Sequence, residues 1–181
     1  MFNPDWGRWI FTSAVTHFNS RRVELPLFVE GSDKTGRRRD TDYAEFRLNG
    51  PFYKELSKDY WYITIDINVL VITLTDPKDA FKCERNIGKV CRMFDDKFSV
   101  FKLGDEPQDT KQFLECAIME MEGLTGGIQT FHYGKVDPTV AVVEASVEAT
   151  YKLYLSVTKD DTAIFLSVKD VVDVSDGLLL T

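Results

Sequence analysis

The chain contains a long stretch, from Trp61 to Leu74, in which apolar and polar residues alternate. Every odd position from Trp61 to Val71 is apolar. The even positions carry Tyr62, Thr64, Asp66 and Asn68, and they become apolar from Leu70 onwards. A period of two in β-branched residues predicts a strand with one face on a hydrophobic core. We therefore expect this strand to be the centre of the fold.

A second alternating stretch covers residues 141–157. Its odd positions are all apolar, and its even positions are mostly Glu, Ser, Thr and Lys. A strand of this length is unusual, because strands in globular proteins are typically about 5–6 residues long. The pattern predicts a ribbon with one solvated face, which either projects from the domain or is completed by a neighbouring molecule.

Two segments have helical periodicity. Residues 4–19 follow a typical helix start at Asn3-Pro4-Asp5 and place apolar residues near helical spacing. Residues 78–94 repeat apolar positions at intervals of three and four. Trp6 and Trp9 give the first helix a large apolar surface. This surface either docks on the sheet of its own domain or packs on a neighbouring subunit, since Trp is enriched in interface cores.

Shorter strands complete the predicted fold, and Asn49-Gly50-Pro51 is expected to end one of them. The segments read as strands are 25–29, 44–48, 98–103, 113–122, 128–133 and 163–168. The pair 113–122 and 128–133 is expected to form a hairpin across a Gly-rich turn. The sequence thus predicts a single α+β domain over residues 1–181, mainly an antiparallel β-sheet with two flanking helices.

Two segments depart from this alternation and suggest contacts between subunits. Residues 31–42 contain no apolar residue and include an arginine run, which we expect to become ordered on an adjacent subunit. The C-terminal tail, residues 170–181, is strongly apolar and would promote aggregation unless it docks within the chain or on a partner. The candidate subunit-interface residues are Trp6, Trp9, Arg37, Arg38, Arg39, Val174, Leu178, Leu179 and Leu180.

Composition narrows the class of protein. The chain has 181 residues, of which 44% are apolar and 13% aromatic, so it can bury a core and is not expected to be disordered. Its net charge of −7 opposes non-specific binding to DNA or to an anionic membrane. Three scattered cysteines and a start without a signal-peptide pattern indicate a soluble protein made in a reducing cytoplasm.

Motifs for catalysis or metal binding are missing from the sequence. There is neither a G-x-S-x-G nucleophile turn nor a Walker A loop, and His17, His132 and the cysteines lack zinc-ligand spacing. The carboxylate pairs Asp95-Asp96 and Asp160-Asp161 fall in segments where adjacent side chains diverge or are solvated. We therefore expect no enzymatic activity, cofactor or metal.

Three stretches together resemble a known family. They are LPLFVEG (25–31), GPFYKELSKDYWYITIDINVLV (50–71) and FHYGKVDPTVAVVEASVEATYKLYL (131–155), preceded by the helix RWIFTSAVTHF (8–18). This combination is similar to tail and neck structural proteins of tailed bacteriophages, most closely the small tail-terminator or tail-completion type. Residues 31–42 and 104–112 and the segment after Lys159 lie outside the resemblance.

The resemblance implies a structural role in the virion. A subunit of this type closes into a ring, usually of six copies, which caps the tail tube and joins it to the neck, with DNA only passing through the lumen. No catalytic residues are implied, and the subunit would be made in the bacterial host cytoplasm. The alternatives are another phage neck connector or a tail-tube protein, a non-virion assembly chaperone, and a small-molecule-binding or enzymatic α+β domain.

Overall fold

The computed structural model describes residues 5–21, 25–30, 41–102, 114–123, 127–137, 142–157 and 163–166. The two helices in these ranges are α1 (Trp6–Ser20) and α2 (Lys82–Cys91). The strands are β1 (Leu27–Val29), β2 (Tyr43–Ser57), β3 (Tyr60–Leu74), β4 (Lys97–Lys102), β5 (Leu114–Met121), β6 (Gln129–Asp137), β7 (Val142–Val157) and β8 (Ala163–Leu166). The chain is therefore α+β, with strands predominating.

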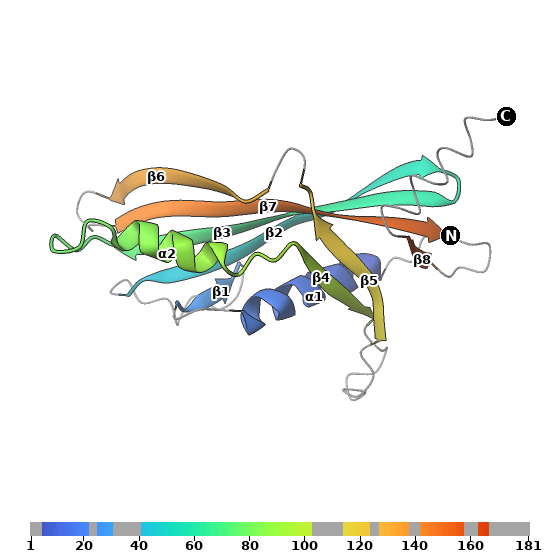
Figure 1. Cartoon of the computed structure of the whole chain (residues 1–181), viewed down its shortest axis with the longest axis horizontal. Helices are drawn as coiled ribbons and strands as arrows, with labels where there is room; N and C mark the ends of the chain where they lie inside the picture. The colour runs from blue at the N-terminus through green and yellow to red at the C-terminus, as the bar shows by residue number, and fades with distance from the viewer. Residues whose placement is uncertain are drawn as a thin grey trace.

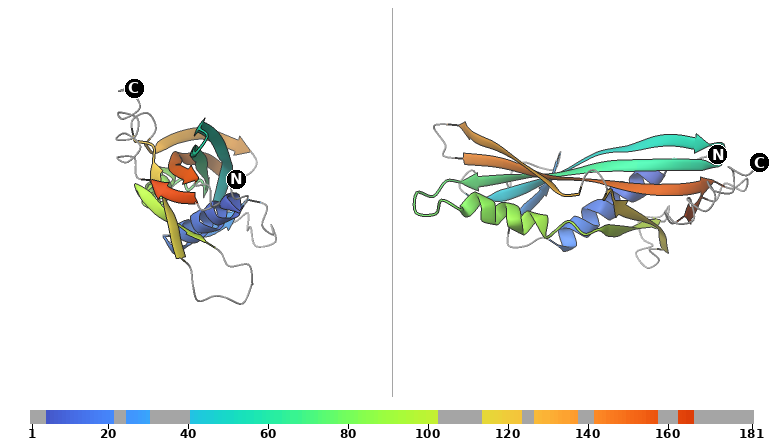
Figure 2. Two further views of the ribbon diagram at one scale, coloured as in Figure 1. Left: turned by 90° about the vertical axis from the view of Figure 1, so that its right-hand side faces the viewer. Right: turned by 45° about the horizontal axis from the view of Figure 1, so that its top comes forward.

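All eight strands belong to one sheet, in the order β1-β2-β3-β7-β5-β4, and β6 and β8 also pair with β7. The β1–β2 pair is parallel and the other pairs are antiparallel, so the sheet is mixed. The long strands β2, β3 and β7 run along the longest axis of the molecule (Figure 1). The sheet curls, and both helices lie on its concave side (Figure 2).

The two long alternating stretches of the sequence form the central strand pair, β3 and β7. The two strands pair without interruption from Tyr60↔Ser156 to Leu74↔Val142. From Ile63 to Thr73 in β3 and from Ala145 to Leu155 in β7, the odd-numbered residues are buried on the concave face, which we call the inner face, and the even-numbered residues form the outer face. The period-two prediction is confirmed for both strands. The second edge of β7 is taken in succession by β6, β5 and β8, so strands of the same chain complete this ribbon.

The helices cover the inner face. Both contribute to one hydrophobic cluster with the inner-face residues of β2, β3, β4, β5 and β7. The helices are shorter than predicted. The second begins at Lys82 because Asp76 holds a turn before it by accepting a hydrogen bond from the Lys78 N–H. The first begins at Trp6, with Asp5 at the N-cap position.

The prediction that Asn49-Gly50-Pro51 ends a strand is wrong, because β2 continues through these residues as a bulge. Asn49 pairs with Asp66 and Phe52 with Thr64, so Gly50 and Pro51 lie together opposite a single residue of β3. Gly50 has φ +110°, a conformation that residues with a Cβ rarely adopt. Pro51 is accommodated because β1 pairs only with residues 44–46 of β2, so within the described part of the chain no strand bonds to β2 beyond them.

The predicted hairpin between residues 113–122 and 128–133 is also wrong. The strand β5 pairs with β4 and with residues 151–152 of β7, whereas β6 pairs along residues 142–148 of β7. The strand predicted over residues 128–133 is longer in the structure, because β6 extends to Asp137. The hairpin partner of β6 is thus the strand that follows it.

Candidate functional site

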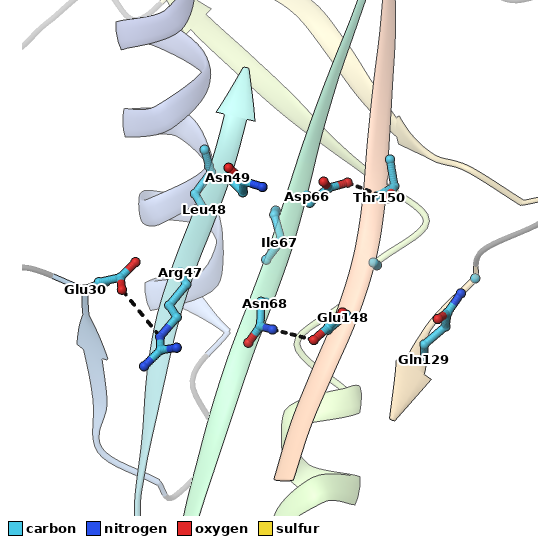
Figure 3. Close-up of a pocket in the computed structure, with 12 residues that line it drawn as sticks. Glu30, Arg47, Leu48, Asn49, Asp66, Ile67, Asn68, Gln129, Glu148 and Thr150 are labelled. Atoms are coloured by element: carbon cyan, nitrogen blue, oxygen red, sulfur yellow. Dashed lines mark hydrogen bonds and ion pairs between the residues drawn. The ribbon is translucent and has the colours of Figure 1, made fainter. Parts of the chain in front are cut away.

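The outer face of the central strands carries a polar groove with a volume of about 440 Å³. Residues of β2, β3 and β7 form its floor, and Glu30, Gly127 and Gln129 border it (Figure 3). We call this site the outer groove. Its polar lining residues are Glu30, Arg47, Asn49, Asp66, Asn68, Gln129, Glu148 and Thr150.

Strand register explains why the floor is polar. Asp66 and Asn68 occupy even positions of β3, and the antiparallel pairing places Thr150 opposite Asp66 and Glu148 opposite Asn68. The Thr150 hydroxyl donates a hydrogen bond to Asp66 Oδ1 at 2.7 Å, and the Asn68 amide donates to Glu148 Oε1 (Figure 3). Ser146 also donates to Glu148 Oε1, at 2.9 Å.

Among the described residues that line the groove, the cation is Arg47, on the β2 side. The Arg47 guanidinium lies 3.7 Å from a Glu30 carboxylate oxygen and 3.3 Å from a Glu45 carboxylate oxygen. The Glu45 side chain is almost fully buried, so its ion pair with Arg47 compensates a charge that is removed from water. Arg47 is therefore engaged by carboxylates on its own side of the groove.

Asp66 and Glu148 differ from Glu30 in their partners. The hydrogen bonds described for these two carboxylates come from neutral hydroxyl and amide groups, and the ion pairs between described residues include neither. The arrangement can therefore hold a ligand that donates hydrogen bonds and carries positive charge. Within the described ranges, no three His, Cys, Asp or Glu side chains are placed to hold a metal ion.

Further along the outer face, Tyr62 and Tyr154 lie side by side with ring centroids 5.0 Å apart. The Tyr62 hydroxyl donates a hydrogen bond to Glu122 at 3.4 Å. Burial, followed by the negative charge of Glu122, raises the pKa of Tyr62 to about 12. Both hydroxyls therefore stay protonated at neutral pH and act as hydrogen-bond groups.

Beyond this tyrosine pair, the β2–β3 hairpin continues as an arm of residues 51–60 at one end of the molecule (Figure 1). Every residue from Phe52 to Asp59 is exposed. Three of them are large and apolar: Phe52 is 48% exposed, Tyr53 41% and Leu56 48%. The hairpin arm is thus an apolar surface that the described part of the chain leaves in contact with water.

The predicted interface residues fall into two groups. Trp6 and Trp9 are only 2% and 5% exposed, since they pack in the core of their own chain. Their docking on the sheet of their own chain is confirmed, and their place at a subunit interface stays a prediction. The other predicted residues lie outside the described ranges: Arg37, Arg38, Arg39, Val174, Leu178, Leu179 and Leu180.

The two histidines do not share a site. His17 is half-buried on α1, where its Nε2 lies 3.5 Å from an Asp95 carboxylate oxygen. Burial lowers the pKa of His17, the Asp95 carboxylate raises it by less, and Arg21 lowers it further. His132 is exposed on β6. Neither histidine lines the outer groove.

Sequence reasoning did not identify the outer groove. The signal was present in the polar even positions of β3, and Glu148 was recognisable as part of a solvated strand face. What the sequence lacked was the register that brings these residues together with Glu30 and Arg47 from earlier in the chain.

No protein-family model matches the chain, and no curated protein matches it either. In the described ranges, neither helix is long and apolar enough to cross a membrane.

Proposed function

We propose that this protein is a virion structural subunit of a tailed bacteriophage, which forms a ring at the head–tail junction. In this proposal the ring has six copies, terminates the tail tube and joins it to the neck, and leaves a lumen for DNA. The proposal rests on the sequence resemblance together with one feature of the molecule, the exposed apolar hairpin arm. It involves no membrane, cofactor or catalytic residue.

The hairpin arm supports an assembly role because two of its apolar side chains, Phe52 and Leu56, are each 48% exposed. Phe52, Tyr53 and Leu56 are clustered within five residues at the end of an elongated sheet. An exposed apolar cluster is a common mark of a protein–protein interface. If each arm packs on the next copy in a head-to-tail manner, a closed rotation yields a ring.

Assembly can be tested by mass photometry and negative-stain electron microscopy of the purified chain. We expect rings of several copies, and we expect Phe52→Ser combined with Leu56→Ser to shift the population to monomers. Phe81→Ser is the matched control, because Phe81 is 71% exposed but lies before α2 and outside the arm. A wild-type chain that stays monomeric at high concentration and is missing from virions would rule out the ring.

Within this proposal, another neck connector or a tail-tube protein remains the alternative position in the virion. Particle imaging with a labelled subunit separates these positions, because each predicts a different level along the tail axis.

A second candidate function, favoured by the outer groove, is that of a small-molecule-binding α+β domain. The groove has the size of a ligand site, and its polar groups converge from four strands. This candidate predicts a monomer whose groove residues, and not its arm residues, are needed for function. Screening for ligands that raise the melting temperature, with Glu148→Gln as the comparison variant, tests it.

A further inference from the structure

We propose that the hairpin arm of one copy packs on strand β6 of a second copy, where Phe131, Tyr133 and the adjoining Glu144 of β7 form the receiving surface. We call these three residues the β6 surface. The inference rests on the proposed function, which gives each arm a partner copy but not the surface that the arm meets. It is supported by a second exposed apolar cluster, by the distance between the two clusters, and by their opposite charges.

Strand β6 presents a cluster of exposed apolar side chains. Ile128, just before the strand, is 39% exposed, Phe131 42% and Tyr133 55%. Phe131 lies opposite Ser146 of β7, and the Tyr133 and Ser146 hydroxyls share a hydrogen bond at 2.9 Å. Because Ser146 is an even-numbered residue of β7, both aromatic side chains belong to the outer face. Exposed aromatic clusters of this kind are typical of protein–protein contacts.

The hairpin arm turns an aromatic side chain and a cation towards the same face. Phe52 and Lys54 lie opposite Thr64 and Tyr62 of β3, which belong to the outer face. Tyr53 lies between them on the other face of the strand, because successive side chains point to opposite faces. The outer face of the arm is therefore the one that matches the β6 surface in kind.

The two clusters lie too far apart to cover each other within one chain. Phe52 is opposite Thr64, which pairs with Lys152 of β7. Phe131 is opposite Ser146, six residues earlier on β7. At about 3.3 Å per residue, these positions are about 20 Å apart along the strands. Figure 1 shows β6 and the arm at opposite ends of the molecule.

Contact between the arm and the β6 surface therefore joins two copies through different surfaces. Such a contact is heterologous, and it leaves one arm and one β6 surface open at the ends of every short chain of copies. A closed rotation satisfies all of them, which is the ring of the proposed function.

The two surfaces carry opposite charges. Lys54 is exposed on the arm, and Glu144 lies on the outer face of β7 because it is opposite Ile72 of β3. The ion pairs between described residues include neither Lys54 nor Glu144. The nearest carboxylate of the arm, Glu55, follows Lys54 directly and so lies on the other face. Opposite charges at the edge of an interface fix its orientation and disfavour wrong partners.

Substitution on β6 tests the receiving surface by sedimentation velocity of the purified chain. We expect Phe131→Ser combined with Tyr133→Ser to convert oligomers into monomers, because the arm then meets no apolar surface. His132→Ser is the matched control, since His132 is exposed on the same strand but lies opposite Ala145, a residue of the inner face. A thermal melt verifies that each variant is folded.

Mixing two variants shows which surfaces meet. The Phe52→Ser, Leu56→Ser chain keeps its β6 surface, and the Phe131→Ser, Tyr133→Ser chain keeps its arm. Each mixed pair retains one complete contact, so we expect dimers in the mixture and no larger species. Two folded variants that stay monomeric together at about 500 μM, well above a micromolar Kd, would overturn the proposal.

Charge exchange provides a test without apolar substitutions. Lys54→Glu and Glu144→Lys should each weaken assembly by about tenfold, because each brings like charges together. Both changes in one chain restore the attraction between copies and should recover assembly. Lys97→Glu, an exposed change on β4, is the control. A folded double variant that assembles no better than either single variant contradicts the pairing.

The outcomes separate this contact from the proposed ring. Rings that persist in a folded Phe131→Ser, Tyr133→Ser chain overturn the β6 surface and leave the ring intact. If that chain loses stability while its oligomers persist, a segment of the same chain covers β6, and the inference is equally overturned. Open oligomers that need both surfaces but are missing from virions support this contact and overturn the proposed function.

Discussion

Gly50 is the residue whose backbone permits β2 to pass through its bulge. Its φ is +110°, and a Cβ at this position would lie 3.1 Å from both the Phe52 nitrogen and the Thr64 carbonyl oxygen. Both atoms belong to the backbone, so neither can move away without disturbing the β2–β3 ladder. We expect Gly50→Ala to lower the free energy of unfolding by about 1–3 kcal/mol in urea denaturation.

Gly88→Ala provides the opposite control within the same chain. Gly88 lies in α2, where an added Cβ meets no atom within 4 Å. Alanine should stabilise this helix by about 0.5–1 kcal/mol. A Gly50→Ala chain as stable as the wild type would show that the bulge does not need a glycine.

His17 makes stability depend on pH. Burial lowers its pKa below the ordinary value of 6.5, against the smaller opposing effect of Asp95. The unfolded chain then takes up a proton at a higher pH than the folded chain does. The free energy of unfolding should therefore be constant above about pH 7 and fall as the pH drops through 6.5 towards the folded pKa.

Urea denaturation between pH 8 and pH 5 measures this dependence, and His17→Gln should flatten it over that range. His132→Gln is the matched control, because His132 is exposed on β6. A slope that survives in the His17 variant would assign the pH dependence to another group.

At the scale of elements, α2 is joined to the sheet by Asp42. This carboxylate accepts hydrogen bonds from the Leu74 N–H at 3.0 Å, Lys82 Nζ at 2.9 Å and Asn86 Nδ2 at 2.9 Å. Burial acts to raise the pKa of Asp42, but these donors together lower it below its usual value. One side chain before β2 thus connects the end of β3 to two turns of α2.

Asp42→Ala should therefore loosen α2 more than the rest of the fold. We expect a loss of about 2–3 kcal/mol in the free energy of unfolding, because Asn86 is left buried without this partner. Hydrogen exchange should accelerate at the amides of residues 82–91 before those of β3 change. Glu84→Ala, on the exposed face of the same helix, is the control. Uniform acceleration over the whole sheet would contradict a local anchor.

The strands that could be predicted from sequence are those whose faces differ in polarity. Ile63 and Tyr151 are buried on the inner face as their positions indicate, and both belong to uninterrupted alternating runs. The errors arose where pairing is decided by distant contacts. Gly50 permits either a turn or a bulge, and only the continued ladder with β3 selects the bulge. The Gly-rich segment after β5 looked like a hairpin turn, although β6 has its register with β7.

The outer groove could not be predicted for the same physical reason. The alternation in β3 alone predicts that Asp66 lies on the polar face. Its neighbours Thr150 and Glu148 belong to a strand about eighty residues later and are joined to β3 by hydrogen bonds. Local patterns assign each side chain to one face of its strand, and the register between strands then decides which side chains become neighbours.

At the scale of the whole molecule, the elongated sheet separates two kinds of surface. The body contains the helices, the core and the outer groove, whereas the hairpin arm at one end presents exposed apolar side chains. If the chain folds around its body and assembles through its ends, substitutions at the ends should leave its free energy of unfolding nearly unchanged. The same substitutions should disrupt its assembly.

The C-terminal tail provides a test of this separation. Residues 171–181 include Val174 and the run Leu178 to Leu180, while the common cluster between sheet and helices draws on elements from α1 to β7. Deleting residues 171–181 should therefore lower the assembled fraction in mass photometry strongly, while changing the free energy of unfolding by less than about 1 kcal/mol. Changing the three leucines to Ser keeps the chain length and should have the same effect. If both changes reduce stability and assembly in parallel, the tail belongs to the fold of the subunit, and contacts between copies must come from the hairpin arm alone.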